Sequence, residues 1–124
     1  LLVEAGFEYT ADWILDDQPC KINTDKGTLY SVPYTTELND IPIMLSQSHV
    51  SSVLYDRTMD YVDAIYEEGK DNVRVMSVAV HPYIHGVPHR IKYFRKIFED
   101  LSNRPGVVFM TGAQILDWYL SQQD

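Results

Sequence analysis

The chain has 124 residues with 10 Lys and Arg against 18 Asp and Glu, a formal net charge of -8. This length fits one domain spanning residues 1–124, and it is short for a complete α/β barrel, which needs about 250 residues. The negative charge argues against a nucleic-acid or anionic-membrane partner, because both bind clusters of Lys and Arg. The first residues lack the basic and uninterrupted apolar character of a signal peptide or a membrane span, so we expect a cytoplasmic protein.

The amino-terminal third predicts a short helix, a strand and a long loop. Gly6 suits the end of a helix, and a strand is expected around residues 7–9. Residues 16–27 are rich in Asp, Pro and Gly and are expected to form the loop. Gly27 would close this loop before a strand over residues 28–33.

Helical patterns dominate the rest of the chain. After a short segment at residues 41–45, Ser48 is a plausible N-cap for a helix that runs to about Glu68. A second helix is predicted over residues 88–102, with Pro88 in its first turn. Residues 107–110 are expected to form a short strand, and Thr111 to cap a final helix.

His81 stands where an apolar, β-branched segment meets a proline. Residues 73–80 predict a buried parallel strand, and Pro82 ends its ladder because it lacks a backbone donor. Strands alternate with helices after residue 28, which predicts parallel βα units whose carboxyl ends, at residues 33–34 and 81–82, share one rim. That rim is where α/β folds build substrate sites. A histidine that only caps the strand by hydrogen bonding is the alternative.

Three histidines recur every four residues, at His81, His85 and His89. On a helix this spacing would align three imidazoles for a metal. Pro82, Gly86 and Pro88 interrupt any helix here, so we predict no metal site in this chain and assign His85 and His89 to a loop or a helix start.

Other chemistry-bearing residues are few. Asp12, Asp16 and Asp17 follow the first strand, where they would orient an imidazole, line a polar pocket or simply form turns. Cys20 is the only cysteine, which excludes an intrachain disulfide, and no base stands beside it in sequence.

The segment around His81 resembles a family motif. Its sequence, SVAVHPYIHGVPHR from Ser77 to Arg90, is similar to the Leu/Val-His-Pro-x-x-x-Gly-x-Pro-x-Arg pattern near the carboxyl end of polysaccharide deacetylase-like proteins. The similarity is greatest to the subgroup with metal-independent allantoinases. Further segments match in the same order, at residues 5–12, 16–19, 32–35 with 39–40, and 111–119.

The resemblance implies a hydrolase of non-peptide C–N amide bonds on a distorted (β/α) barrel, with parallel strands and flanking helices. His81 matches the late catalytic acid of that family, and imidazole exchanges protons near neutral pH. Candidate substrate-binding residues are Tyr34, Asp17, Asn39 and Trp13. The implied substrate is a small amide or an acetylated sugar, as in carbohydrate metabolism.

The early motifs of the family, an Asp-Asp pair and His-x-x-x-His, have no counterpart in this chain. A divalent metal would therefore belong to a full-length parent, and none is expected here. The expected partner is the missing amino-terminal half or a second copy, since a half barrel exposes sheet edges. Two hypotheses follow: the carboxyl-terminal part of such a hydrolase, or a non-catalytic α/β module for assembly or ligand binding.

Overall fold

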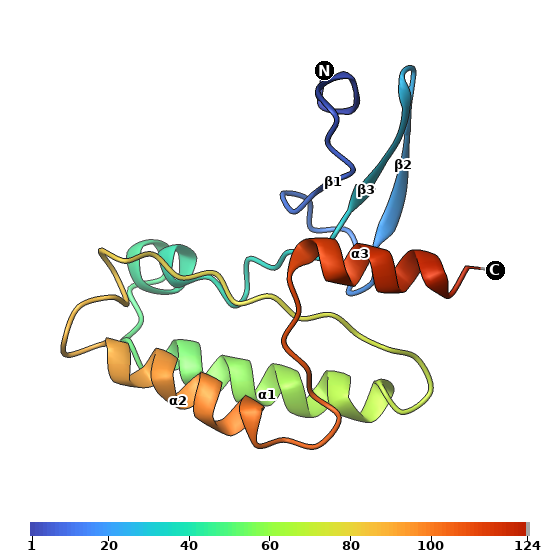
Figure 1. The fold of residues 1–124 in the computed structure, drawn as a ribbon. Helices are drawn as coiled ribbons and strands as arrows, with labels where there is room; N and C mark the ends of the chain where they lie inside the picture. The colour runs from blue at the N-terminus through green and yellow to red at the C-terminus, as the bar shows by residue number, and fades with distance from the viewer. Residues whose placement is uncertain (124) are drawn as a thin grey trace. The chain divides into compact units, whose positions relative to one another are not determined.

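A computed structural model describes residues 1–123. The chain divides into two compact units, which are described separately (Figure 1). Unit 1 comprises Leu1–Tyr34 together with the chain from Met110 onward, and unit 2 comprises Thr35–Phe109. None of the helices within residues 1–123 combines the length and the apolar character needed to cross a membrane.

Unit 1 is built on a small mixed sheet in the order β1-β3-β2. The strands are β1 (Tyr9–Thr10), β2 (Cys20–Thr24) and β3 (Gly27–Ser31). β1 pairs with β3 in parallel, whereas β2 and β3 form an antiparallel hairpin. The expected loop over residues 16–27 is therefore wrong in its second half, because the turn before Gly27 connects two paired strands. Gly27 has φ 130°, which glycine adopts without strain.

Two helical elements complete unit 1. A single 3-10 turn, η1 (Val3–Ala5), ends at Gly6 with φ 84°, as the sequence predicts. The helix α3 (Gly112–Ser121) has the expected N-cap at Thr111: the Thr111 side chain accepts from the backbone N–H of Gln114, and the Gln114 side chain accepts from the backbone N–H of Thr111.

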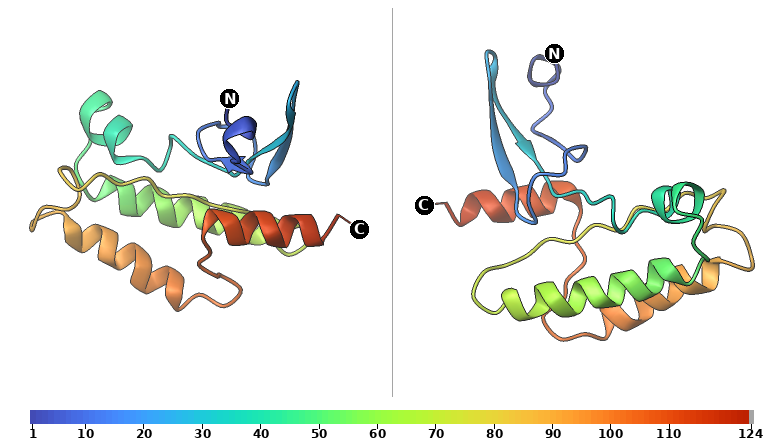
Figure 2. Two further views of the ribbon diagram at one scale, coloured as in Figure 1. Left: turned by 45° about the horizontal axis from the view of Figure 1, so that its top comes forward. Right: turned by 180° about the vertical axis from the view of Figure 1, so that it is seen from behind.

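Unit 2 is helical around one apolar core. It contains η2 (Pro42–Ser46), α1 (Val53–Glu68) and α2 (Ile91–Ser102). The helices α1 and α2 run side by side in both views of Figure 2. The buried core residues come from all three elements: Ile43, Leu54, Val62, Ile97 and Leu101.

The boundaries of the two long helices differ from those predicted. The helix α1 begins at Val53 with Ser52 at its N-cap position, four residues later than a cap at Ser48 would start it, and Ser48 has a positive φ of 57°. The helix α2 begins at Ile91, and Pro88 lies in the turn that precedes it.

The predicted strand over residues 73–80 is the main correction to the fold. This segment is extended, and Met76, Val78 and Val80 pack against the core, but it forms only an isolated parallel bridge between Asn39 and Ala79. A ladder needs a neighbouring strand, and among residues 1–123 the chain offers this segment only that short partner. The predicted strand over residues 107–110 is likewise unpaired in the structure.

Candidate functional site

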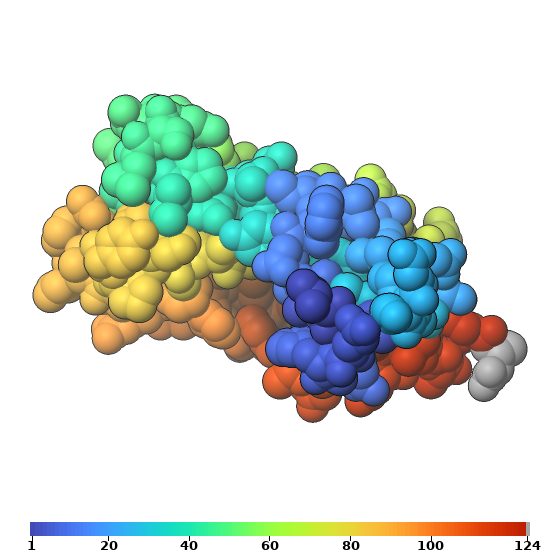
Figure 3. Space-filling view, turned by 90° about the horizontal axis from the view of Figure 1, so that it is seen from above, coloured from blue at the N-terminus to red at the C-terminus, as the bar shows by residue number. Residues whose placement is uncertain are grey.

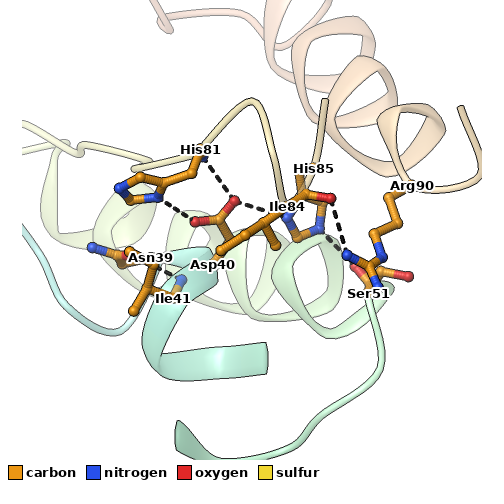
Figure 4. Close-up of polar contacts among 8 residues, drawn as sticks. All are labelled: Asn39, Asp40, Ile41, Ser51, His81, Ile84, His85 and Arg90. Carbon is orange, nitrogen blue, oxygen red and sulfur yellow. Dashed lines mark hydrogen bonds and ion pairs between the residues drawn. The ribbon is translucent and has the colours of Figure 1, made fainter. Parts of the chain in front are cut away.

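Main-chain hydrogen bonds bring Asp40 and His81 together. At the bridge between Asn39 and Ala79, the amide of Ala79 donates to the carbonyl of Leu38 at 2.9 Å. The amide of Asp40 donates to the carbonyl of Ala79 at 3.1 Å. The parallel pairing therefore places Asp40 one step beyond the bridge on one segment and His81 two residues beyond it on the other (Figure 4).

Asp40 and His81 form a carboxylate–imidazole pair. Nδ1 of His81 lies 2.7 Å from Oδ1 of Asp40, and the backbone N–H of His81 donates to Oδ2 at 2.8 Å. Asp40 is fully buried, whereas the His81 side chain is 33% exposed. An ionised carboxylate only accepts hydrogen bonds, so with Asp40 in that form this contact requires the ring hydrogen of His81 to be on Nδ1.

The second ring nitrogen of His81, Nε2, is left open by this arrangement. Nε2 points away from Asp40 in Figure 4, and within residues 1–123 it has no hydrogen-bond partner. The chain around residue 80 also lies at the surface of unit 2 (Figure 3). The ring of Tyr83 flanks the imidazole, with centroids 5.5 Å apart. An imidazole oriented through Nδ1 with Nε2 accessible is the geometry of a general acid or base.

A tight turn holds the second histidine against the same carboxylate. The carbonyl of His81 accepts from the amides of Ile84 at 2.9 Å and His85 at 3.0 Å. This turn returns His85 to Asp40, where its Nδ1 lies 3.1 Å from Oδ2. Nε2 of His85 lies 3.2 Å from the carbonyl oxygen of Ser51.

Glycine at position 86 allows this turn to form. A Cβ at Gly86 would lie 2.3 Å from the carbonyl oxygen of Pro82 and 2.9 Å from its Cα, closer than real Cβ atoms approach backbone. Beyond the turn, the guanidinium of Arg90 donates to the carbonyl of Ile84 at 3.2 Å. The Gly-x-Pro-x-Arg part of the motif thus shapes the loop that presents both histidines.

The four predicted substrate-binding residues fall in different units. Asn39 is buried beside Asp40 in unit 2, and its side-chain oxygen accepts from the amide of Ile41 at 2.9 Å. Trp13, Asp17 and Tyr34 belong to unit 1, and Trp13 is exposed. Their role in substrate binding stays a prediction.

Sequence reasoning missed Asp40 and His85. The carboxylate that contacts the His81 ring is Asp40, whereas Asp12, one of the carboxylates expected to orient an imidazole, accepts a hydrogen bond from the hydroxyl of Thr10. Asp40 follows Asn39 and looks like a turn former, and it is separated from His81 by 41 positions. His85 lies four residues after His81 within the same motif, and this spacing was a signal for it. Pro82, Gly86 and Pro88 nevertheless suggested that His85 lies only in a loop.

Neither a nucleophilic thiol nor a metal cluster is built into the described part of the chain. Burial, and secondarily the charge of Asp16, raises the pKa of the Cys20 thiol, which favours the unreactive protonated form. Within residues 1–123, no group of three or more His, Cys, Asp or Glu side chains has the placement to hold a metal ion.

Sequence and structure comparisons both find similarity to proteins named as polysaccharide deacetylases. No protein-family model matches the chain. A Schizosaccharomyces pombe protein named "Putative polysaccharide deacetylase" is 32% identical over 115 residues, which cover 87% of this chain and 36% of that protein.

Solved structures show the same fold. A "probable Polysaccharide deacetylase" from Pseudomonas aeruginosa PAO1 matches 98% of this chain with a TM-score of 0.84 and 22% identity, over 42% of its own length. A Puue allantoinase matches 98% of this chain with a TM-score of 0.89 and 23% identity, over 41% of its own length.

The architecture is thus the mixed α/β arrangement of the matching part of deacetylase and allantoinase structures. The chain is similar in sequence to a protein named as a polysaccharide deacetylase, and the similarity lies in the carboxyl-terminal part of these relatives. It spans well under half of the length of each of them.

Proposed function

We propose that this chain is the carboxyl-terminal part of a deacetylase-like hydrolase of non-peptide C–N amide bonds, with His81 as its catalytic acid. The observation that carries the proposal is the pair formed by His81 and the buried Asp40, joined at 2.7 Å. The sequence relationship to a protein named as a polysaccharide deacetylase supports the choice of reaction.

The reaction assigns one proton transfer to this chain. As water adds to the amide carbonyl and the C–N bond breaks, the departing nitrogen needs a proton. His81 in its protonated form donates that proton from Nε2, while Asp40 accepts the hydrogen bond from Nδ1 and holds the ring. The base that activates water lies outside this chain in our proposal, because the early motifs of the family have no counterpart here.

The substrate in this proposal is a small amide or an acetylated sugar. Trp13, Asp17, Tyr34 and Asn39 are the residues that we propose to bind it. The residues present do not make a metal site within positions 1–123, so no step is assigned to a metal. A divalent metal would belong to the rest of a full-length protein, which we place in the cytoplasm.

The remainder of the barrel comes from an amino-terminal half or from a second copy. The chain spans 36% to 42% of its relatives, which supports a larger catalytic assembly. The sheet of unit 1 has three strands in the described residues, which is part of a barrel at most.

A non-catalytic module for assembly or ligand binding is the second candidate. One observation favours it: Trp13, Ile14 and Leu15 are consecutive apolar side chains, and each is more than half exposed. Such a run is typical of an interaction surface.

The substitution His81→Ala distinguishes the two candidates. Turnover of an N-acetylated oligosaccharide and of a cyclic ureide is measured with the complementing amino-terminal half present. We expect a loss of about 10²–10⁴ in rate for His81→Ala, the usual contribution of general acid catalysis. The control His89→Ala, at an exposed position of the same segment, should keep its rate. Equal rates for the His81 variant and the unsubstituted enzyme would remove His81 from catalysis.

A further inference from the structure

His85 is a buried ionisable side chain to which the proposed reaction gives no role. Its side chain is 1% exposed, and each ring nitrogen has one hydrogen-bond partner. Nδ1 faces Oδ2 of Asp40 at 3.1 Å, and Nε2 faces the carbonyl oxygen of Ser51 at 3.2 Å (Figure 4).

The two partners of His85 decide how many protons its ring carries. A peptide carbonyl oxygen only accepts hydrogen bonds, so Nε2 must donate to Ser51. An ionised carboxylate also only accepts, so Nδ1 must donate to Asp40. An imidazole that donates from both nitrogens is the positively charged form.

Burial of Asp40 gives an independent reason for a positive charge at this place. A carboxylate with no solvent exposure is costly unless it is paired and hydrogen-bonded. A charged His85 would turn the buried carboxylate into a neutral pair, and its contact with Oδ2 leaves Oδ1 for His81.

The remaining charged neighbour works in the opposite direction. Arg90 lies beside His85 in Figure 4, but its guanidinium is directed at the carbonyl of Ile84 at 3.2 Å. Asp40 contacts the ring of His85 directly at 3.1 Å, whereas Arg90 is bonded to the neighbouring main-chain carbonyl.

We propose that His85 is a doubly protonated positioning residue that balances the charge of Asp40 and thereby sets how firmly His81 holds its proton. The effect on His81 rests on the proposed function, whereas the protonation of His85 does not. With a neutral residue at position 85, the full charge of Asp40 would act on His81. His81 would then keep its proton more strongly and donate it more slowly.

The protonation of His85 is measured first, on the intact protein without substitution. Histidine is labelled with ¹⁵N in the ring, and the chain has 4 histidines, which single substitutions assign. We expect both ring nitrogens of His85 to carry a hydrogen at neutral pH, seen as two protonated-type ¹⁵N shifts. One bare ring nitrogen on His85 would overturn the proposal whatever the enzyme does.

Variants then test the influence of His85 on His81. His85→Asn keeps an amide donor near Asp40 without charge, and His89→Asn makes the same change at an exposed position. For the first variant we expect turnover to fall about 10- to 100-fold, the range known for loss of the hydrogen-bonded partners behind metal-bound histidines. The alkaline limb of its pH–rate profile should move to higher pH.

An unmoved profile for folded His85→Asn would contradict the influence on His81, because a merely structural loss lowers the amount of active protein and not its pH dependence. If His81→Ala leaves turnover intact, the proposed function fails, and the ¹⁵N measurement still decides the charge of His85.

Discussion

Replacement of Asp40 by Asn removes the negative charge on which the site is built. The carboxylate of Asp40 accepts three contacts: the backbone N–H of His81 at 2.8 Å, Nδ1 of His81 at 2.7 Å and Nδ1 of His85 at 3.1 Å. An amide has one accepting oxygen, so its NH₂ group would face a donor on one side. A charged His85 would also lose its counter-ion in a place without solvent.

The expected cost is set by that buried pair. Removing one partner of a buried ion pair typically destabilises a protein by about 3–5 kcal/mol, because the other partner stays buried and uncompensated. This is a large share of an ordinary unfolding free energy of about 5–15 kcal/mol. At urea slopes of about 1–3 kcal/mol/M, it lowers the unfolding midpoint by roughly 1 M or more.

The assay must report on unit 2. Both tryptophans, Trp13 and Trp118, belong to unit 1, so their fluorescence does not report the unfolding of unit 2. Urea unfolding is instead followed by the NMR amide signals of residues 35–109. The matched control is Asp60→Asn at an exposed position of α1, which should stay within about 0.5 kcal/mol of the unsubstituted protein. A similarly small change for Asp40→Asn would refute the inference that this carboxylate holds the site together.

Two further predictions concern the surroundings of the pair. Gly86→Ala places a Cβ 2.3 Å from the carbonyl oxygen of Pro82, so we expect a loss of about 1–3 kcal/mol and altered NMR shifts of the His85 ring; unchanged shifts would show that the turn accommodates a side chain. The hydroxyl of Thr35, assisted by the backbone amide of Glu37, lowers the pKa of the Glu37 carboxyl. This carboxylate therefore adds stability above its ordinary pKa range, and the gain is lost as the pH falls through its lowered value in the folded protein. Thr35→Val should return the Glu37 titration, read by carboxyl ¹³C NMR, toward its ordinary range, and a titration that does not move would contradict the assigned cause.

The sequence singled out His81 but not the residues that contact its ring. A β-branched run that ends at proline was sufficient to single out His81, because that signal is local. Asp40 lies 41 positions away and is delivered by a backbone bridge, which has no side-chain pattern. The neighbours of Asp40, Ile41 and the buried Asn39, resemble the residues found in ordinary turns.

The prediction of secondary structure was wrong where the formation of a strand depends on pairing with a distant segment. Residues 73–80 have strand propensity, yet a strand also needs a neighbour, and this depends on chain far away in sequence. The hairpin was predictable: partly buried Cys20 and Ile22 alternate with exposed Lys21, and Asp25, Lys26 and Gly27 are a recognisable turn. The cap at Thr111 was correct because capping depends on residues three apart.

The bridge between Asn39 and Ala79 also determines which changes the site tolerates. The distance between acid and carboxylate depends on amide and carbonyl groups that every residue except proline possesses. The side chain at position 79 can therefore vary without altering this spacing, while proline is excluded there and at position 40. At position 79, variation among related chains should thus be permissive in side chain and strict in backbone, the reverse of what a search for invariant residues would notice.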